Sequence, residues 1–269
     1  MMHLVASDLD RTLIYSPRAL GPSVPELTLV ERDDEGEPLS YFTARAGQLL
    51  AELAQWAVFV PVTTRTLKQY RRIELPVAAR YAICANGGRL LVAGKRDRDW
   101  ETALDARLSA SGVALAEVVE QLQTFADPRW TRKQRVAEDL FAYLVIERKQ
   151  LPAGWLAELT GWCAERGWTV SLQGRKVYAV PRALTKSAAV AEVTRRLDGP
   201  CTVLAAGDSL LDADLLLAAD AGWHPGHGEL AEQGWTAPGV TGLATRGVRA
   251  GEEILATLLA RVTGGQRPA

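Results

Sequence analysis

Short apolar runs alternate with amphipathic stretches towards both ends of the chain. The runs are largely apolar and are followed closely by polar residues: 4–8, 57–62, 81–84 and 202–206. Such runs are typical of strands buried on both faces of a parallel sheet. Apolar residues recur at helical spacing in three further stretches: 44–55, 186–196 and 212–219. This alternation predicts an α/β fold, with a Rossmann-like parallel sheet and helices on both of its faces.

The pattern changes between residues 89 and 180, where the apolar positions become more amphipathic. Strands are expected at 89–92, 141–147, 168–172 and 176–180, and helices near 103–125 and 152–166. Gln173, Gly174 and Arg175 suit a hairpin turn between the last two of these strands. We therefore predict an α+β cap domain at 89–180, inserted into a core formed by 1–88 and 181–269.

A projecting hairpin is expected at 15–42. Asp34, Glu35 and Gly36 separate two stretches that favour β structure, directly after the first predicted strand. From that position the hairpin could serve as a flap over the carboxyl edge of the sheet.

Composition narrows the class of protein. The 269 residues are 48% hydrophobic, which is enough for a large core, and the formal net charge of -1 gives no reason to expect nucleic acid or a membrane as a partner. No stretch suits a membrane span or a secretory leader. Cys84, Cys163 and Cys201 are too few and too widely spaced for a disulfide framework or a zinc site, so we expect reduced core residues. These features predict a cytoplasmic protein and leave its oligomeric state open.

Polar side chains that can support chemistry follow the predicted core strands. They are Asp8 and Asp10, Thr63 and Thr64, Asn86, and Asp208 with Asp212, while Lys186 opens a helix. The carboxyl ends of parallel strands share one edge of the sheet, so these groups should converge there. Adjacent carboxylates repel unless a cation or a proton lies between them, and Mg2+ prefers carboxylate, water and phosphate oxygens. A bound metal would turn the acidic cluster into a site for a phosphoryl group, with the hydroxyl and the lysine as further contacts.

The order of these residues resembles the motifs of the haloacid dehalogenase (HAD) superfamily of phosphohydrolases. The segment Asp8-Leu9-Asp10-Arg11-Thr12 matches its first motif, Asp-x-Asp-x-Thr, and Thr63 at a strand end matches the second. Lys186 matches the third, and Gly207-Asp208-Ser209-Leu210-Leu211-Asp212 matches the fourth. The large insertion between the second and third motifs is similar to that of sucrose-phosphate and mannosylphosphoglycerate phosphatases.

The resemblance implies a Mg2+-dependent phosphatase that hydrolyses a small phosphorylated metabolite, with a sugar phosphate as the first expectation. Asp8 would be the nucleophile that forms an aspartyl phosphate, and Asp10 would be the general acid and base. Thr63 and Lys186 would hold the phosphoryl oxygens. The implied metal ligands are Asp8, the backbone carbonyl of Asp10, Asp208 and, directly or through water, Asp212.

The chain departs from the family pattern around the expected substrate. Arg11 and Thr64 stand where the family commonly has glycine, and Leu211 replaces an asparagine that often precedes the last aspartate. Asn86, with Gly87, is similar to a substrate-side turn of the family. We predict that Arg11, Thr64 and Asn86 contact the substrate.

Other hypotheses remain open at this point. A phosphomutase of the same superfamily would return the phosphoryl group to the substrate, and a noncatalytic protein would bind through the inserted domain and keep the site as a relic. The opening residues also resemble superfamily members of tellurite-resistance and stress gene clusters, which indicates no particular substrate.

Several other features are better explained without a site. His224 and His227 lie in a Gly/Pro loop and are left out of the metal cluster. The basic residues of the inserted domain are expected to form a solvated face, and most of its tryptophans to be buried. The basic residues are Arg132, Lys133, Arg135 and Arg175, and the tryptophans are Trp100, Trp130, Trp155, Trp162 and Trp168.

Overall fold

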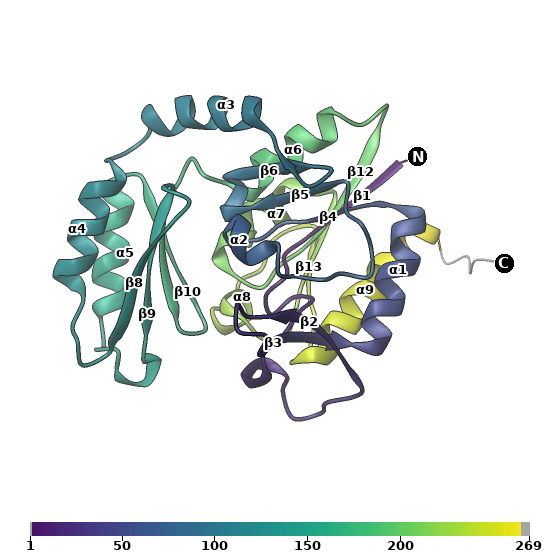
Figure 1. Ribbon diagram of the computed structural model, residues 1–269, viewed down its shortest axis with the longest axis horizontal. Coiled ribbons are helices and arrows are strands. Elements are labelled where there is room, and N and C mark those ends of the chain that lie inside the picture. The colour runs from purple at the N-terminus through teal and green to yellow at the C-terminus, as the bar shows by residue number, and fades with distance from the viewer. Residues whose placement is uncertain (1, 265–269) are drawn as a thin grey trace. The chain divides into compact units, whose positions relative to one another are not determined.

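The computed structural model describes residues 2–264, which form two compact units (Figure 1). One unit combines the residues up to 96 with those from 186 onward, and the other comprises residues 97–185. The first unit is built on a parallel sheet with the strand order β14-β13-β12-β1-β4. Its strands are β1 (Met2–Ser7), β4 (Val58–Pro61), β12 (Cys201–Ala206), β13 (Ala221–His224) and β14 (Val240–Gly242). The predicted parallel sheet is therefore confirmed.

Helices cover both faces of this sheet. The helices of this unit are α1 (Ala44–Trp56), α2 (Leu67–Tyr70), α6 (Lys186–Arg195), α7 (Ala213–Ala218), α8 (Glu229–Glu232) and α9 (Val248–Thr263), and its 3-10 helices are η1 (Pro17–Ala19), η2 (Ala85–Gly87) and η4 (Leu210–Asp212). Helices α1 and α9 pack together on one face, and α6 and α7 lie together on the other (Figure 1). Leu53 and Leu258 meet Val5 of β1 in the apolar core. Within residues 2–264, no helix is both long enough and apolar enough to cross a bilayer.

The strand expected at 81–84 forms, but it begins a separate antiparallel sheet. Strand β5 (Tyr81–Cys84) pairs with β6 (Arg89–Val92), which pairs with β7 (Lys95–Arg96). One parallel bridge between Val62 and Ile83 keeps β5 beside the end of β4. The segment expected as the first strand of the inserted domain, 89–92, thus belongs to the first unit.

Residues 15–42 contain the expected hairpin. Strand β2 (Leu27–Arg32) pairs antiparallel with β3 (Pro38–Thr43). In the turn, Asp33 Oδ1 accepts hydrogen bonds from the amides of Glu35 at 3.0 Å and Glu37 at 2.8 Å. Gly36 has a φ of +90°, which a glycine adopts without the strain of a side chain.

The second unit is an α+β layer structure with the antiparallel strand order β10-β11-β9-β8. Its elements are α3 (Arg98–Ser109), α4 (Leu115–Phe125), β8 (Thr131–Ala137), β9 (Phe141–Ile146), the 3-10 helix η3 (Arg148–Gln150), α5 (Trp155–Glu165), β10 (Trp168–Gln173) and β11 (Lys176–Pro181). The helical stretch expected near 103–125 is divided, because Gly112 at φ +68° approaches Arg166 so closely that an added Cβ would lie 2.4 Å from its carbonyl oxygen. Most of the tryptophans are buried, as expected, and the four basic residues are exposed: Arg132, Lys133, Arg135 and Arg175.

Candidate active site

Two neighbouring strands bring Asp8 and Asp208 to one edge of the parallel sheet. Strands β1 and β12 are in register, with Ser7 opposite Ala206. The amide of Asp8 donates to the carbonyl of Ala206 at 2.9 Å, so the backbone pairing continues to the nucleophile expected from the sequence. Asp208 follows the same strand end two residues later.

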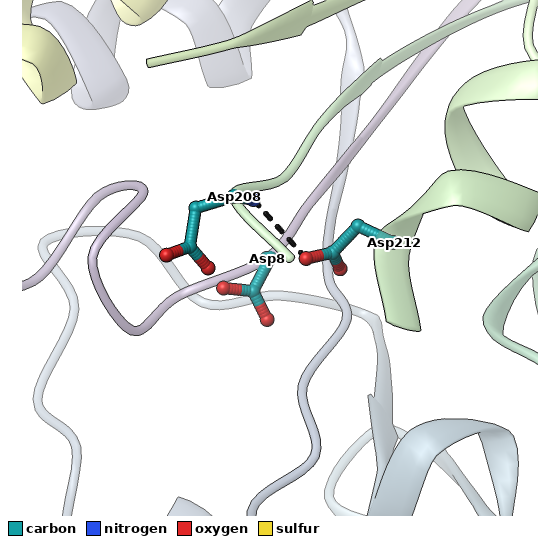
Figure 2. A group of neighbouring side chains, drawn as sticks. All are labelled: Asp8, Asp208 and Asp212. Atoms are coloured by element: carbon teal, nitrogen blue, oxygen red, sulfur yellow. Dashed lines mark hydrogen bonds between the residues drawn. The ribbon is translucent and has the colours of Figure 1, made fainter. Parts of the chain in front are cut away.

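Asp212 completes a cluster of three buried carboxylates (Figure 2). One oxygen from each of Asp8, Asp208 and Asp212 lies within 4.8 Å of the others. Asp212 can fold back on this edge because position 207 is glycine: an added Cβ there would lie 2.3 Å from the Cβ of Asp212. The turn from Gly207 to Asp212 is thus shaped to present two acidic side chains together.

Lys186, the first residue of α6, is buried against this cluster. Its Nζ donates to Asp8 Oδ1 at 2.7 Å and to Asp212 Oδ1 at 2.5 Å. Burial by itself would lower the pKa of Lys186, but the two carboxylates outweigh it and raise the pKa above its usual value. The lysine therefore stays charged in the core.

The negative charges of the carboxylates are less completely compensated than the positive charge of the lysine. Burial, opposed by Lys186 and reinforced by Asp212, raises the pKa of Asp8 to about 7. Burial and the charges of Asp8 and Asp212 also raise the pKa of Asp208 well above its usual range. Ionised together, these groups need more positive charge than the lysine supplies.

Both carboxylate oxygens of Asp212 accept hydrogen bonds from groups of the protein. Its Oδ2 accepts from the amides of Asp208 at 3.1 Å and Ser209 at 3.0 Å and from the Ser209 hydroxyl at 2.8 Å. Its Oδ1 accepts from Lys186. Asp212 thus fixes both the lysine and the turn that carries Asp208.

Thr63 and Asn86 are held together next to α6. The amide of Asn86 donates to the carbonyl of Thr63 at 3.0 Å, and η2 packs against α6. Asn86 adopts the left-handed conformation with φ 56°, which asparagine tolerates better than most residues. Thr63, Thr64 and Asn86 are all buried, and the hydroxyl of Thr63 accepts from the amide of Arg65 at 3.1 Å.

Asp10 is not one of the three clustered carboxylates and is paired with Arg65, which the sequence did not identify. Arg65 Nε donates to Asp10 Oδ2 at 2.6 Å, and Nη2 donates to Oδ1 at 2.7 Å. Arg65 Nη1 lies 2.6 Å from Oε1 of the buried Glu31. No sequence motif predicted the contact of Arg65 with Glu31, since Glu31 belongs to the hairpin.

Arg11 reaches the cluster from the loop after β1. Its Nε lies 3.2 Å from Asp208 Oδ2, so it is the second cation at the acidic cluster. The residue has a φ of 61°, and its carbonyl oxygen is 2.8 Å from Nε2 of His227. His227 Nδ1 accepts from the amide of Gly247 at 3.1 Å, which leaves Nε2 as the protonated nitrogen that donates to Arg11. His227, interpreted from the sequence as an ordinary loop residue, thus supports the first motif.

Comparison with known proteins adds evidence on the fold. No protein-family model matches the sequence, and no curated protein matches it. Among solved structures, sucrose-phosphatase from Synechocystis sp. PCC6803 is 16% identical over 96% of this chain and 98% of its own, with a TM-score of 0.64. The C-terminal domain of trehalose-6-phosphate phosphatase from C. albicans is 13% identical over 96% and 92%, with a TM-score of 0.55.

A third structure comes from a phosphatase of the haloalkanoate (HAD) enzyme superfamily, BT1666 from Bacteroides thetaiotaomicron. It is 14% identical over 96% of this chain and 95% of its own, with a TM-score of 0.52. Coverage this complete at such low identity shows a shared fold and confirms the predicted fold class. The protein has the fold of HAD superfamily phosphatases.

Proposed function

We propose that the protein is a phosphomonoesterase that hydrolyses a small phosphorylated metabolite, with a sugar phosphate as the first candidate. The observation that carries this proposal is the buried carboxylate of Asp8, which contacts Lys186 on one side and faces Asp208 on the other. Such a carboxylate can be a nucleophile for phosphorus if cations screen it from the incoming anion. The matched structures of a sucrose-phosphatase and a trehalose-6-phosphate phosphatase support a sugar phosphate as substrate.

The donor set fits Mg2+. Among residues 2–264, the ion pairs to the three buried carboxylates come from Lys186 and Arg11, and all the candidate ligand atoms are hard oxygens. Asp8, Asp208 and the carbonyl of Asp10 would be the ligands, while the fully engaged Asp212 would act through water or by holding Lys186. When bound, Mg2+ would offset the charge of the phosphoryl oxygens and orient them.

The chemistry would run through Asp8. One of its oxygens forms a bond to phosphorus while the bond from phosphorus to the leaving oxygen breaks, and Asp10 gives that oxygen a proton. Water then attacks the aspartyl phosphate and gives a proton to Asp10, and the bond between Asp8 and phosphorus breaks to release phosphate. Lys186 and the Thr63 hydroxyl would hold phosphoryl oxygens in both steps.

Substrate selection would involve groups outside this set. Arg11 and Thr64 are proposed to contact the substrate because they directly follow Asp10 and Thr63 in the chain, and Asn86 because its amide donates to the carbonyl of Thr63. The unit at 97–185 would act as the cap, and the hairpin at 15–42 as a flap. A cytoplasmic location also stays a prediction.

The experiment measures phosphate release from a panel of sugar phosphates and simple esters, in Mg2+ and in EDTA. Wild-type protein should release phosphate only with Mg2+, and Asp8→Asn should lower the rate by at least about 10³. Formation of an isomeric sugar phosphate without phosphate release would replace the hydrolase by a phosphomutase. No turnover of any ester would reject both and favour a noncatalytic protein.

A further inference from the structure

We propose that Arg65 is a positioning residue for Asp10, and that the β2–β3 hairpin holds it in place through Glu31 and Ser40. The inference rests on the proposed function, in which Asp10 is the general acid and base. The hairpin would then have a structural part in catalysis, in addition to the proposed role of a flap.

The first step is the geometry of the Arg65 guanidinium. Its Nε and Nη2 donate to the two oxygens of Asp10 at 2.6 and 2.7 Å, which is a bidentate fork. A planar fork fixes the plane of the carboxylate as well as its position. The Asp10 side chain is 43% exposed, so the fork adds a restriction on its rotation that burial alone does not supply.

The second step is that the far side of the guanidinium is anchored on the hairpin. Arg65 Nη1 lies 2.6 Å from Glu31 Oε1, and Ser40 donates to Glu31 Oε2 at 2.6 Å. The register of β2 and β3 shifts on both sides of Glu31, so Glu31 is buried next to the buried Val30 instead of alternating with it. The bulge therefore aims a carboxylate inward where a regular strand would have pointed it out.

The third step is charge. Asp10 and Glu31 carry two negative charges, and Arg65 with Arg72, whose Nη2 lies 3.1 Å from Glu31 Oε1, carries two positive ones. Arg72 also lies 3.6 Å from Asp34, which pairs with Lys68, so this wider network has three charges of each sign, unlike the cluster around Asp8. A balanced, partly buried network is suited to hold a geometry rather than to bind a further ion.

The same segment also reaches the phosphoryl contacts. The Arg65 amide donates to Thr63 Oγ1, and its carbonyl accepts from the amide of Ala85 at 2.7 Å. One residue thus ties Thr63 and Asp10 to the hairpin. A displacement of about 1 Å at a reacting group can cost about 10² in rate, so loosening this connection should be measurable.

The test compares esters that need a general acid with esters that do not. Arg65→Lys keeps the charge but cannot form the fork, and Glu31→Gln removes the anchor while keeping its shape. We expect Arg65→Lys to lower kcat on sugar phosphates by about 10- to 100-fold and on an aryl phosphate by less than about 3-fold, since only the poor leaving group needs a proton. Glu31→Gln should also lower kcat on sugar phosphates more than on the aryl phosphate, but by a smaller factor than Arg65→Lys. It should change KM little.

Arg32→Lys is the matched control, because Arg32 lies on the same hairpin next to Glu31 but is exposed and donates to the Gly36 carbonyl at 2.8 Å. Its rates should stay within about 2-fold of wild type on both ester classes. Equal losses of kcat on both ester classes in Arg65→Lys would overturn this inference but not the proposed function, because a general loss of structure lowers every rate alike. No phosphate release by the wild type would overturn the proposed function, and the inference with it.

A measurement independent of turnover checks the pair itself. A double-mutant cycle of Arg65→Met and Asp10→Asn in urea unfolding should show a coupling of at least about fivefold in the unfolding constant, which is about 1 kcal/mol. Additive effects of the two substitutions would contradict the pairing on which the inference stands.

Discussion

A single buried lysine illustrates how the residues of this site depend on one another. An ammonium group removed from water is costly unless it is paired, and Lys186 has two carboxylate partners at hydrogen-bond distance. Asp212 in turn fixes the turn that carries Asp208, so one charge network holds the lysine and orders the acidic cluster. Replacing any one member should therefore disturb its neighbours.

His227 gives a prediction of pH dependence at the same scale. Burial is the main cause that lowers its pKa to about 4, against 6.5 for an ordinary histidine. The unfolded chain takes up this proton as the pH falls below 6.5, while the folded chain does so only near 4. The stability that neutral His227 contributes is therefore complete above pH 6.5 and is lost progressively as the pH falls towards 4. Between pH 7 and pH 5 the loss should be about 2 kcal/mol.

Urea unfolding of wild type and His227→Gln at pH 7 and pH 5 checks this value. Glutamine cannot take up the proton, so the difference in unfolding free energy between the two pH values should be about 2 kcal/mol smaller in the variant. An identical pH dependence in both proteins would show that His227 is not buried in its neutral form.

The sequence predicted the acidic and basic residues that the structure gathers, because motif spacing together with parallel strands leaves them few other places. Asp8, Lys186, Asp208 and Asp212 are examples. It did not predict the partners of Asp10, since Glu31 points inward only through an irregular register in the hairpin. It also missed His227, whose partner is a backbone carbonyl that a motif cannot reveal.

At the scale of elements, the loop between β13 and α8 determines where Asp208 lies. Gly228 has a φ of +91°, and an added Cβ would lie 2.5 Å from the Asp208 carbonyl oxygen and 2.6 Å from its Oδ2. The amide of Leu230 donates to the same carbonyl at 3.1 Å. The loop thus packs directly on a proposed metal ligand.

Gly228→Ala should weaken Mg2+ binding and lower stability by more than about 2 kcal/mol, because it adds a collision to the backbone strain. Gly234→Ala is the control: its φ of +61° also strains a side chain, although less than the φ of 91° and ψ of 178° at Gly228, and an added Cβ meets nothing within 4 Å. We expect a stability cost of about 1 kcal/mol there and unchanged Mg2+ affinity. Calorimetric titration with Mg2+ and urea unfolding measure both, and equal effects of the two substitutions would mean that the loop does not position Asp208.

Elements were predictable where burial imposes a pattern on the sequence. The apolar runs of β1, β4, β5 and β12 were recognised, with bounds close to those observed. Strand β8 was not, because its sequence is mostly polar and only Ala137 is buried, so it depends on pairing with β9. The division between α3 and α4 was also missed, since it depends on the approach of Gly112 to a distant carbonyl.

For the molecule as a whole, the acidic cluster and its lysine lie within one compact unit, although their sequence positions span 8 to 212. The intervening residues 97–185 form a unit of their own. Binding of a cation at the cluster should therefore stabilise the first unit directly, and its effect should be visible in the unfolding of the full chain.

Mg2+ should raise the melting temperature of the full-length protein. A ligand that binds only the folded chain adds about 2.7 kcal/mol at about 100 times its Kd, which corresponds to roughly 5–10 °C for a unit of this size. Melting followed by circular dichroism in EDTA and in increasing MgCl2, at constant ionic strength, measures the shift. Asp208→Asn should abolish the shift, whereas Asp198→Asn, at an exposed position of the same unit, should retain it. Equal melting temperatures of the wild type in EDTA and Mg2+ would remove the metal from the proposal, because a buried cluster that binds a cation cannot leave the folding equilibrium unchanged.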